Sequence, residues 1–128
     1  MKTKKIICRI LIVDDDDDLC RIMKAILRKE GPIHIEHTLN EAEDHVRQID
    51  PTILFLDNNL PDGQGIDRIR VIKELCPQAS IVLMTADTTP NLKELALSEG
   101  AIQFIAKPFS SNALHELVYA ICPDLNAA

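Results

Sequence analysis

Three short, uninterrupted apolar runs divide the chain, at residues 10–13, 53–56 and 81–84, and each ends abruptly in polar residues. Runs this short and this uniformly apolar are typical of parallel strands that are covered on both faces of a sheet. Two further segments, residues 33–37 and 101–106, mix polar with apolar side chains over a similar length. We therefore expect five strands, with the two mixed ones at the edges of the sheet.

Helical patterns separate and follow these strands. Residues 38–41 form a capping box that would begin the second helix. Thr89 and Pro90 predict the N-cap and first turn of the fourth helix, and Gly100 predicts its end. The other three helices are predicted from apolar residues that recur on one helical face: Leu19, Ile22, Met23, Ile26 and Leu27; Ile66, Ile69, Ile72 and Leu75; and Leu114, Leu117, Val118 and Ile121.

The alternation of strands and helices predicts an α/β fold, in which helices cover both faces of a doubly wound, five-stranded parallel sheet. Right-handed crossovers and polar edge strands favour the strand order 2-1-3-4-5, the order of the flavodoxin-like (βα)5 fold. A chain of 128 residues suits one domain. We expect that domain to occupy residues 1–128, with its core at about residues 8–122.

The composition of the chain argues against two classes of function, nucleic-acid binding and membrane spanning. A net charge of −6 argues against direct binding of nucleic acid, which needs a clustered basic surface. No apolar stretch approaches the roughly 18 residues of a membrane span. The four cysteines have no Cys-x-x-Cys spacing, so we expect reduced, mostly buried thiols in a cytoplasmic protein.

The most informative residues follow the first and third strands. In an open sheet of this order, ligands bind where the strand order reverses, beyond the carboxyl ends of these two strands. Asp14 and Asp15 follow the first strand and Asp57 follows the third, so three carboxylates should meet at one crevice. Two such charges about 4 Å apart repel by roughly 4 kcal/mol at an effective dielectric near 20. Oxygen ligands of this kind favour Mg²⁺ as the neutralising ion.

Two more polar groups are expected at the same edge of the sheet. Thr85 ends the fourth strand and Lys107 ends the fifth. A hydroxyl, an ammonium and a metal ion around a carboxylate can together stabilise a transferring phosphoryl group, whose charge spreads over its oxygens.

With these motifs in place, the chain resembles a two-component response-regulator receiver domain similar to the chemotaxis receivers. The resemblance covers residues of about 10 to 121. It depends on four motifs in the family's order and spacing: the Ile-Leu-Ile-Val-Asp-Asp run at 10–15, the Leu-Asp-Asn-Asn-Leu-Pro-Asp-Gly-Gln-Gly run at 56–65, Met-Thr-Ala at 84–86 and Lys-Pro-Phe at 107–109.

The resemblance implies a role for each residue of the crevice. Asp57 would accept a phosphoryl group from a phosphohistidine on a sensor histidine kinase or phosphotransfer protein. Mg²⁺ would be held by Asp15 and Asp57 directly, by Asp14 through water and by the backbone carbonyl of Asn59.

Other residues would read the phosphoryl group. Thr85 would hydrogen-bond to it, Lys107 would pair with it, and Phe104 would be the switch aromatic that turns inward. The signal would leave through the fourth helix, fifth strand and fifth helix, towards a downstream protein, an output domain or a second copy in a homodimer. Leu97 and Tyr119 are candidates on that face.

Two alternatives stay open at this stage. Asp14, Asp15 and Asp16 loosely match the Asp-x-Asp motif of haloacid-dehalogenase-like phosphatases, in which the first strand supplies the nucleophile. A receiver fold that serves only as a binding scaffold, without phosphorylation, is the other. An EF-hand Ca²⁺ loop that starts at Asp14 fails, because its sixth position is Leu19 and its twelfth is Ala25.

Overall fold

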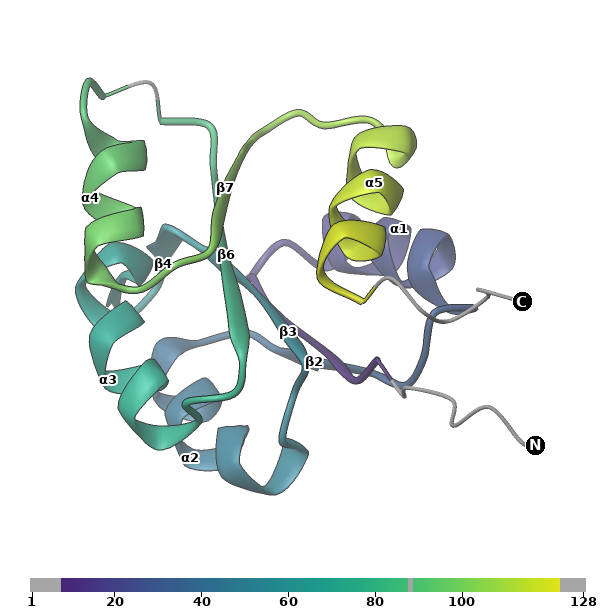
Figure 1. Cartoon of the computed structure of the whole chain (residues 1–128), viewed down its shortest axis with the longest axis horizontal. Coiled ribbons are helices and arrows are strands. Elements are labelled where there is room, and N and C mark those ends of the chain that lie inside the picture. Colours follow the sequence, from purple (N-terminus) through teal and green to yellow (C-terminus); the bar gives the residue numbers. More distant parts are fainter. Residues whose placement is uncertain (1–7, 88, 123–128) are drawn as a thin grey trace.

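A computed structural model describes residues 8–87 and 89–122. The strands and helices alternate along the chain, as Figure 1 shows. In chain order the elements are β1 (Ile10–Val13), α1 (Asp17–Leu27), β2 (Ile33–Glu36), α2 (Leu39–Ile49), β3 (Ile53–Asp57), β4 (Asn59–Leu60), β5 (Gly63–Gln64), the 3-10 helix η1 (Gly65–Arg68), α3 (Ile69–Leu75), β6 (Ser80–Thr85), α4 (Leu92–Glu99), β7 (Gln103–Ala106) and α5 (Ser111–Ile121).

The main sheet has five parallel strands in the order β2-β1-β3-β6-β7. This confirms the doubly wound α/β fold and the strand order predicted from the sequence. The three uniformly apolar runs occupy the centre of the sheet and are buried, whereas the mixed strands β2 and β7 form its edges. Polar side chains are tolerated there because an edge strand has only one neighbour to cover it.

Two apolar cores lie on opposite faces of the sheet. Helices α2, α3 and α4 cover one face, where alternate residues of the central strands such as Leu11, Leu54 and Leu83 pack against them. Helices α1 and α5 cover the other face, against the remaining alternate residues such as Ile12 and Phe55. Figure 1 shows these two layers on either side of the sheet. Because side chains of a strand alternate in direction, both faces of every central strand are buried.

The start of the fourth helix differs from the sequence prediction. Thr89 is not its N-cap and Pro90 is not its first residue, since α4 begins at Leu92 after Asn91, which has a left-handed φ of 69°. The Asp87 carboxylate accepts hydrogen bonds from both the backbone N–H and the hydroxyl of Thr89. These bonds hold Thr89 in a turn before the helix, and Asn91, which stands at the N-cap, makes no side-chain cap hydrogen bond. Gly100 ends α4 as predicted.

Smaller differences concern the lengths of elements. The first turn of the predicted third helix is the 3-10 helix η1, and β7 begins at Gln103 rather than at residue 101. The two-stranded hairpin of β4 and β5 was not predicted. Among the described residues, no helix combines the length and the apolar character that crossing a membrane requires.

Candidate functional site: an acidic crevice with one lysine

Three carboxylates meet at the carboxyl edge of the central strands. Asp14 follows β1, Asp15 comes next, and Asp57 is the last residue of β3. Each offers a carboxylate oxygen, and these oxygens all lie within 4.8 Å of one another. Asp14 and Asp57 are buried, with exposed fractions of 1% and 4%, whereas Asp15 is exposed. The cluster is therefore closed at its base and open to solvent on the side of Asp15.

Lys107 is the cation of this site. It follows β7, and its Nζ lies 2.7 Å from Oδ2 of Asp14 and 2.9 Å from Oδ1 of Asp57. The peptide between Lys107 and Pro108 is cis. Burial alone would lower the pKa of Lys107, but the hydrogen bonds to Asp14 and Asp57 outweigh burial and raise it. Lys107 is therefore protonated over the physiological pH range.

The pKa of Asp57 is raised, chiefly by burial. The hydrogen bond from Lys107 opposes this effect, and the negative charge of Asp14 adds to it. The negative charge at this position is only partly neutralised, because the group holds three carboxylates and one ammonium. A divalent cation would neutralise the two charges that remain within this group. Oxygen donors, excess negative charge and an open side together fit Mg²⁺.

Asp14 and Asp57 differ in how their oxygens are engaged. Asp14 uses both oxygens within the protein, since Oδ2 accepts from Lys107 and Oδ1 accepts from the backbone N–H of Asp16 at 3.0 Å. Asp16 in turn is the N-cap of α1, where its side chain accepts from the N–H groups of Asp18 and Leu19. The rest of the aspartate run therefore stabilises the start of α1, as negative charge does at helix N-termini.

Thr85 and Phe104 lie where the sequence places them, on β6 and β7. Thr85 is buried, and its Oγ1 accepts a hydrogen bond from the N–H of Asp87 at 2.9 Å. Phe104 is partly buried and packs against the core below α2, α3 and α4. It is the cross-strand partner of Leu83, two residues before Thr85 on the neighbouring strand.

The loop after Asp57 has two residues that the sequence analysis missed. Asn58 is buried, its N–H donates to the carbonyl of Met84, and its Oδ1 accepts from the N–H of Ile66. Gly65 leaves no room for a side chain, because a Cβ there would lie 2.4 Å from the backbone oxygen of Asp57. An asparagine directly after the predicted acceptor and a glycine eight positions later were the available signals for this tight loop.

Asn59 begins the hairpin in this loop and pairs with Gln64. Asp62, at the tip of the hairpin, reaches α2, where its two carboxylate oxygens accept from the N–H groups of Leu39 and Asn40, each at 2.9 Å. Burial would raise the pKa of Asp62, but these backbone hydrogen bonds lower it overall. The loop is thereby fixed to the sheet at one end and to α2 at its tip.

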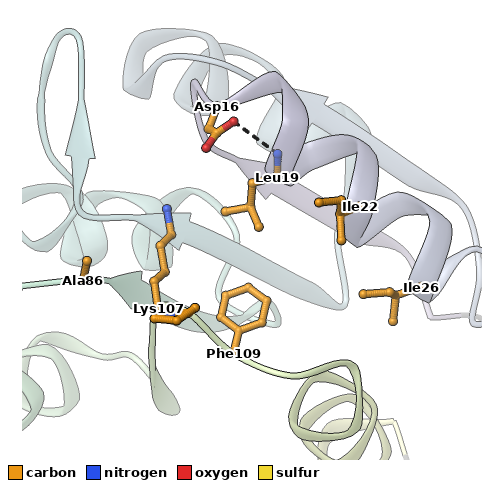
Figure 2. A pocket seen from close by; sticks show the side chains of 8 residues that line it. Asp16, Leu19, Ile22, Ile26, Ala86, Lys107 and Phe109 are labelled. Carbon is orange, nitrogen blue, oxygen red and sulfur yellow. Dashed lines mark hydrogen bonds between the residues drawn. The ribbon is translucent and has the colours of Figure 1, made fainter.

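An apolar cavity of about 420 Å³ opens beside the site, between α1 and the segment after β7. Figure 2 shows Leu19, Ile22 and Ile26 of α1 facing Phe109 across it, with the Lys107 side chain at one end. Its full lining is Asp16, Leu19, Ile22, Ile26, Ala86, Lys107, Pro108 and Phe109. Ile22 is 56% exposed, so the wall of the cavity on α1 is open to solvent.

Comparison with known proteins agrees with this fold. The chain belongs to the response regulator receiver domain family, whose model matches residues 10–119. It is 32% identical over 111 residues to the transcriptional regulatory protein TrcR of Mycobacterium tuberculosis. That alignment covers 86% of this chain and 42% of TrcR, so the chain spans less than half the length of this relative.

Two solved structures give the same result. The beryllofluoride-activated NtrC4 receiver domain dimer has a TM-score of 0.84 and 28% identity, and the match covers 92% of this chain and 98% of that one. A two-component response regulator from Clostridium difficile has a TM-score of 0.86 and 28% identity, over 94% of this chain and 99% of that one. The protein is thus a receiver domain of the two-component signalling type.

Proposed function

We propose that this domain accepts a phosphoryl group on Asp57 from a phosphohistidine of a sensor histidine kinase or phosphotransfer protein. One observation carries the proposal: Asp57 ends a central strand as a buried carboxylate, with Lys107 Nζ at 2.9 Å and two further carboxylates within 4.8 Å. Structural ion pairs rarely collect such an excess of one charge at a strand end, because the repulsion is costly without a ligand.

In the proposed step, a carboxylate oxygen of Asp57 forms a bond to phosphorus while the phosphorus–nitrogen bond of the donor imidazole breaks. The electron pair of that bond stays on the imidazole, and Asp57 becomes a mixed anhydride. Lys107 keeps Asp57 ionised and then pairs with the phosphoryl oxygens. Thr85 donates its hydroxyl hydrogen to one of them, since its Oγ1 accepts from the backbone N–H of Asp87 and its hydrogen is not used in that bond.

Asp57 is a better acceptor than Asp14. Both oxygens of Asp14 already accept hydrogen bonds, from Lys107 and from the backbone of Asp16. This occupancy argues against the haloacid-dehalogenase-like alternative, in which the first-strand aspartate is the nucleophile, and so does membership of the receiver family. The domain acts in this account as a signalling component that is modified once, rather than as an enzyme that turns over.

Asp15 and Asp57 would hold Mg²⁺ directly, Asp14 through water, and Asn59 through its backbone carbonyl. When bound, the ion supplies positive charge next to the phosphoryl oxygens. The protein's own contribution is to hold the oxygen ligands of the ion in place. Asn58 and Gly65 hold the loop after Asp57 against the sheet, and Asp62 ties the tip of that loop to α2.

The phosphodonor protein would pack on the apolar cavity between α1 and the segment after β7. The cavity is continuous with the phosphoacceptor site, because Lys107 lines the one and pairs with Asp57 in the other. An apolar helical surface on the donor fits the walls formed by Ile22, Ile26 and Phe109. Docking there would bring the donor's histidine over the open side of the acidic cluster.

Phosphorylation would be read on the face formed by α4, β7 and α5. The Phe104 ring, which is only partly buried in the unmodified domain, would turn inward as Thr85 moves towards the phosphoryl group. The added charge of roughly −2 biases this equilibrium. Leu97 and Tyr119, which are 41% and 45% exposed, lie on α4 and α5, where a homodimer partner or a downstream target would bind.

Residues 1–128 would form one receiver domain, in the cytoplasm, with neither nucleic acid nor membrane contacts of its own. Its output would be a separate protein or a further domain, as the greater length of TrcR illustrates.

Intact-mass analysis tests the proposal most simply. After incubation with a small phosphodonor and Mg²⁺, the protein should gain the mass of one phosphoryl group, and a chelator added beforehand should prevent the gain. The variant Asp57→Asn should stay unmodified. Modification that persists in this variant would remove Asp57 from its role.

A further inference from the structure

Two thiols meet at the amino ends of the parallel strands, whereas the acidic crevice lies at their carboxyl ends. Cys8 lies two residues before β1, and Cys122 is the C-cap of α5, 114 residues later. Their sulfur atoms are 2.6 Å apart, and their exposed fractions are 0% and 1%. A disulfide needs a separation of about 2.0 Å and a close approach of the two Cβ atoms. The sulfur–sulfur separation is therefore about half an ångström longer than the bond.

The other two cysteines are not arranged in this way. Cys20 and Cys76 are also buried and unbridged. The sulfur of Cys20 contacts the carbonyl oxygen of Asp14 at 3.4 Å, and that of Cys76 contacts a carboxylate oxygen of Asp50 at 3.9 Å. All four cysteines belong to the part of the chain that the structure describes, so Cys8 and Cys122 form its single thiol–thiol contact.

We propose that Cys8 and Cys122 are a redox pair that forms a reversible disulfide within the domain by exchange with a small-molecule disulfide such as oxidised glutathione. A thiolate of the pair attacks one sulfur of the small disulfide, whose sulfur–sulfur bond breaks and releases one thiolate. The second thiol of the pair, once deprotonated, attacks the mixed disulfide and displaces the other half. Two protein thiols are oxidised, and one small disulfide is reduced to two thiols.

The surroundings of the pair determine the rate of this exchange. Burial raises the pKa of both thiols, so the reactive thiolate is scarce at neutral pH. The negative charge of Glu30 acts in the same direction on both. Both sulfurs are buried, so an external disulfide reaches them only when the domain opens locally, and oxidation should be slow and should accelerate as the pH rises.

The bond would connect the beginning of β1 to the end of α5 and would close a loop of more than a hundred residues. Constraining so long a loop restricts the unfolded chain strongly, and we expect the midpoint of thermal unfolding to rise by about 10 °C. The pair lies away from Asp57, so phosphorylation should need neither thiol.

Two matched double variants of the full chain test the proposal. Cys20→Ala/Cys76→Ala keeps the pair, and Cys8→Ala/Cys122→Ala removes it. After incubation with oxidised glutathione, the variant that keeps the pair should become lighter by two hydrogen atoms. Its two thiols should no longer react with an alkylating reagent in denaturant, and its melting temperature should rise. A thiol reductant should reverse all three changes. The second should carry glutathione adducts at most. Peptide mapping of the oxidised wild-type chain, which needs no variant, should find Cys8 joined to Cys122.

Cys20→Ala/Cys76→Ala should also be taken through one cycle of unfolding and refolding in the same redox buffer. If both thiols of this variant still react with the alkylating reagent after prolonged incubation and after that cycle, the proposal is overturned. Stable glutathione adducts, intermolecular dimers or an unchanged melting temperature in that variant would overturn it as well.

Discussion

The ammonium nitrogen of Lys107 lies 2.9 Å from Oδ1 of Asp57, although fifty residues separate the two in the chain. The same nitrogen lies 2.7 Å from Asp14. Lys107 therefore compensates two buried carboxylates from different strands, and Asp15 adds a third charge that it does not contact in this arrangement. The three carboxylates therefore carry more negative charge than Lys107 alone can neutralise.

Removing this lysine should destabilise the domain in a manner that depends on the metal. In Lys107→Met, which keeps most of the apolar stem, the free energy of unfolding in a chelating buffer should fall by about 1 to 3 kcal/mol, because two largely buried carboxylates lose their partner. Mg²⁺ should restore most of the loss. Urea unfolding of this variant and of the exposed control Lys93→Met measures both effects. Equal losses with and without Mg²⁺ would contradict the charge argument.

Asp15 offers a test of the metal site that does not disturb the core, because its side chain is exposed. Asp15→Asn should weaken Mg²⁺ binding by at least about tenfold, since a contact between unlike charges is worth more than 1.4 kcal/mol even at an effective dielectric near 20. Isothermal titration with Mg²⁺ measures the affinity. Asp18→Asn, from the same aspartate run, should bind as the wild type does, and a comparable loss in that control would place the ion elsewhere.

The lowered pKa of Asp62 predicts that the stability of the fold depends on pH. Its pKa is lowered in the folded domain by hydrogen bonds from Leu39 and Asn40 that outweigh burial. A depressed carboxyl pKa stabilises the fold above the unfolded value of about 3.9, and the stabilisation disappears as the pH falls through the folded value.

Asp62→Ala should therefore cost about 1 kcal/mol at pH 7, similar to the loss of a side chain that caps helix N–H groups, and progressively less as the pH falls below about 3.9. Denaturant unfolding across this pH range measures the difference. The exposed Asp44→Ala serves as the control, and a loss in Asp62→Ala that is independent of pH would show that the carboxylate is not the stabilising group.

The apolar cavity beside Lys107 should matter to a protein donor and not to a small one. Ile22→Asp puts a charge on the wall of the cavity without altering a buried residue, since Ile22 is 56% exposed. Transfer from a phosphorylated histidine kinase domain should slow by tenfold or more, while modification by a small phosphodonor stays unchanged. Val71→Asp, on α3 and 40% exposed, is the matched control. Equal slowing with both kinds of donor would indicate damage to the site itself.

The sequence predicted those features that depend on periodicity and on strand ends. Uniformly apolar runs identified the central strands, and the fold rule for strand ends brought Asp14, Asp15 and Asp57 to one crevice. The start of α4 could not be obtained in this way, because it depends on the conformation of the loop before the helix. Asp87 holds the backbone N–H and hydroxyl of Thr89 in a turn before the helix, and the chain turns into α4 only at Asn91, with its left-handed φ.

The hairpin after Asp57 had a visible signal that was not used. Pro61, Asp62 and Gly63 form a recognised turn sequence between two short extended segments. The reach of the Asp62 carboxylate to α2 had no such signal, because the two segments are 23 residues apart and meet only in the folded domain. The cavity beside Lys107 likewise depends on how α1 packs, which spacing along one helix does not reveal.

Reduction of the phosphorylated protein with borohydride tests the central claim most directly, since the reagent converts an aspartyl phosphate into homoserine. After treatment with a small phosphodonor and Mg²⁺, peptide mass spectrometry should find homoserine at position 57 and unchanged aspartate at 14 and 15. Homoserine at position 14 or 15 instead, or a stable phosphoryl group on any other residue type, would contradict the assignment of Asp57 as the acceptor.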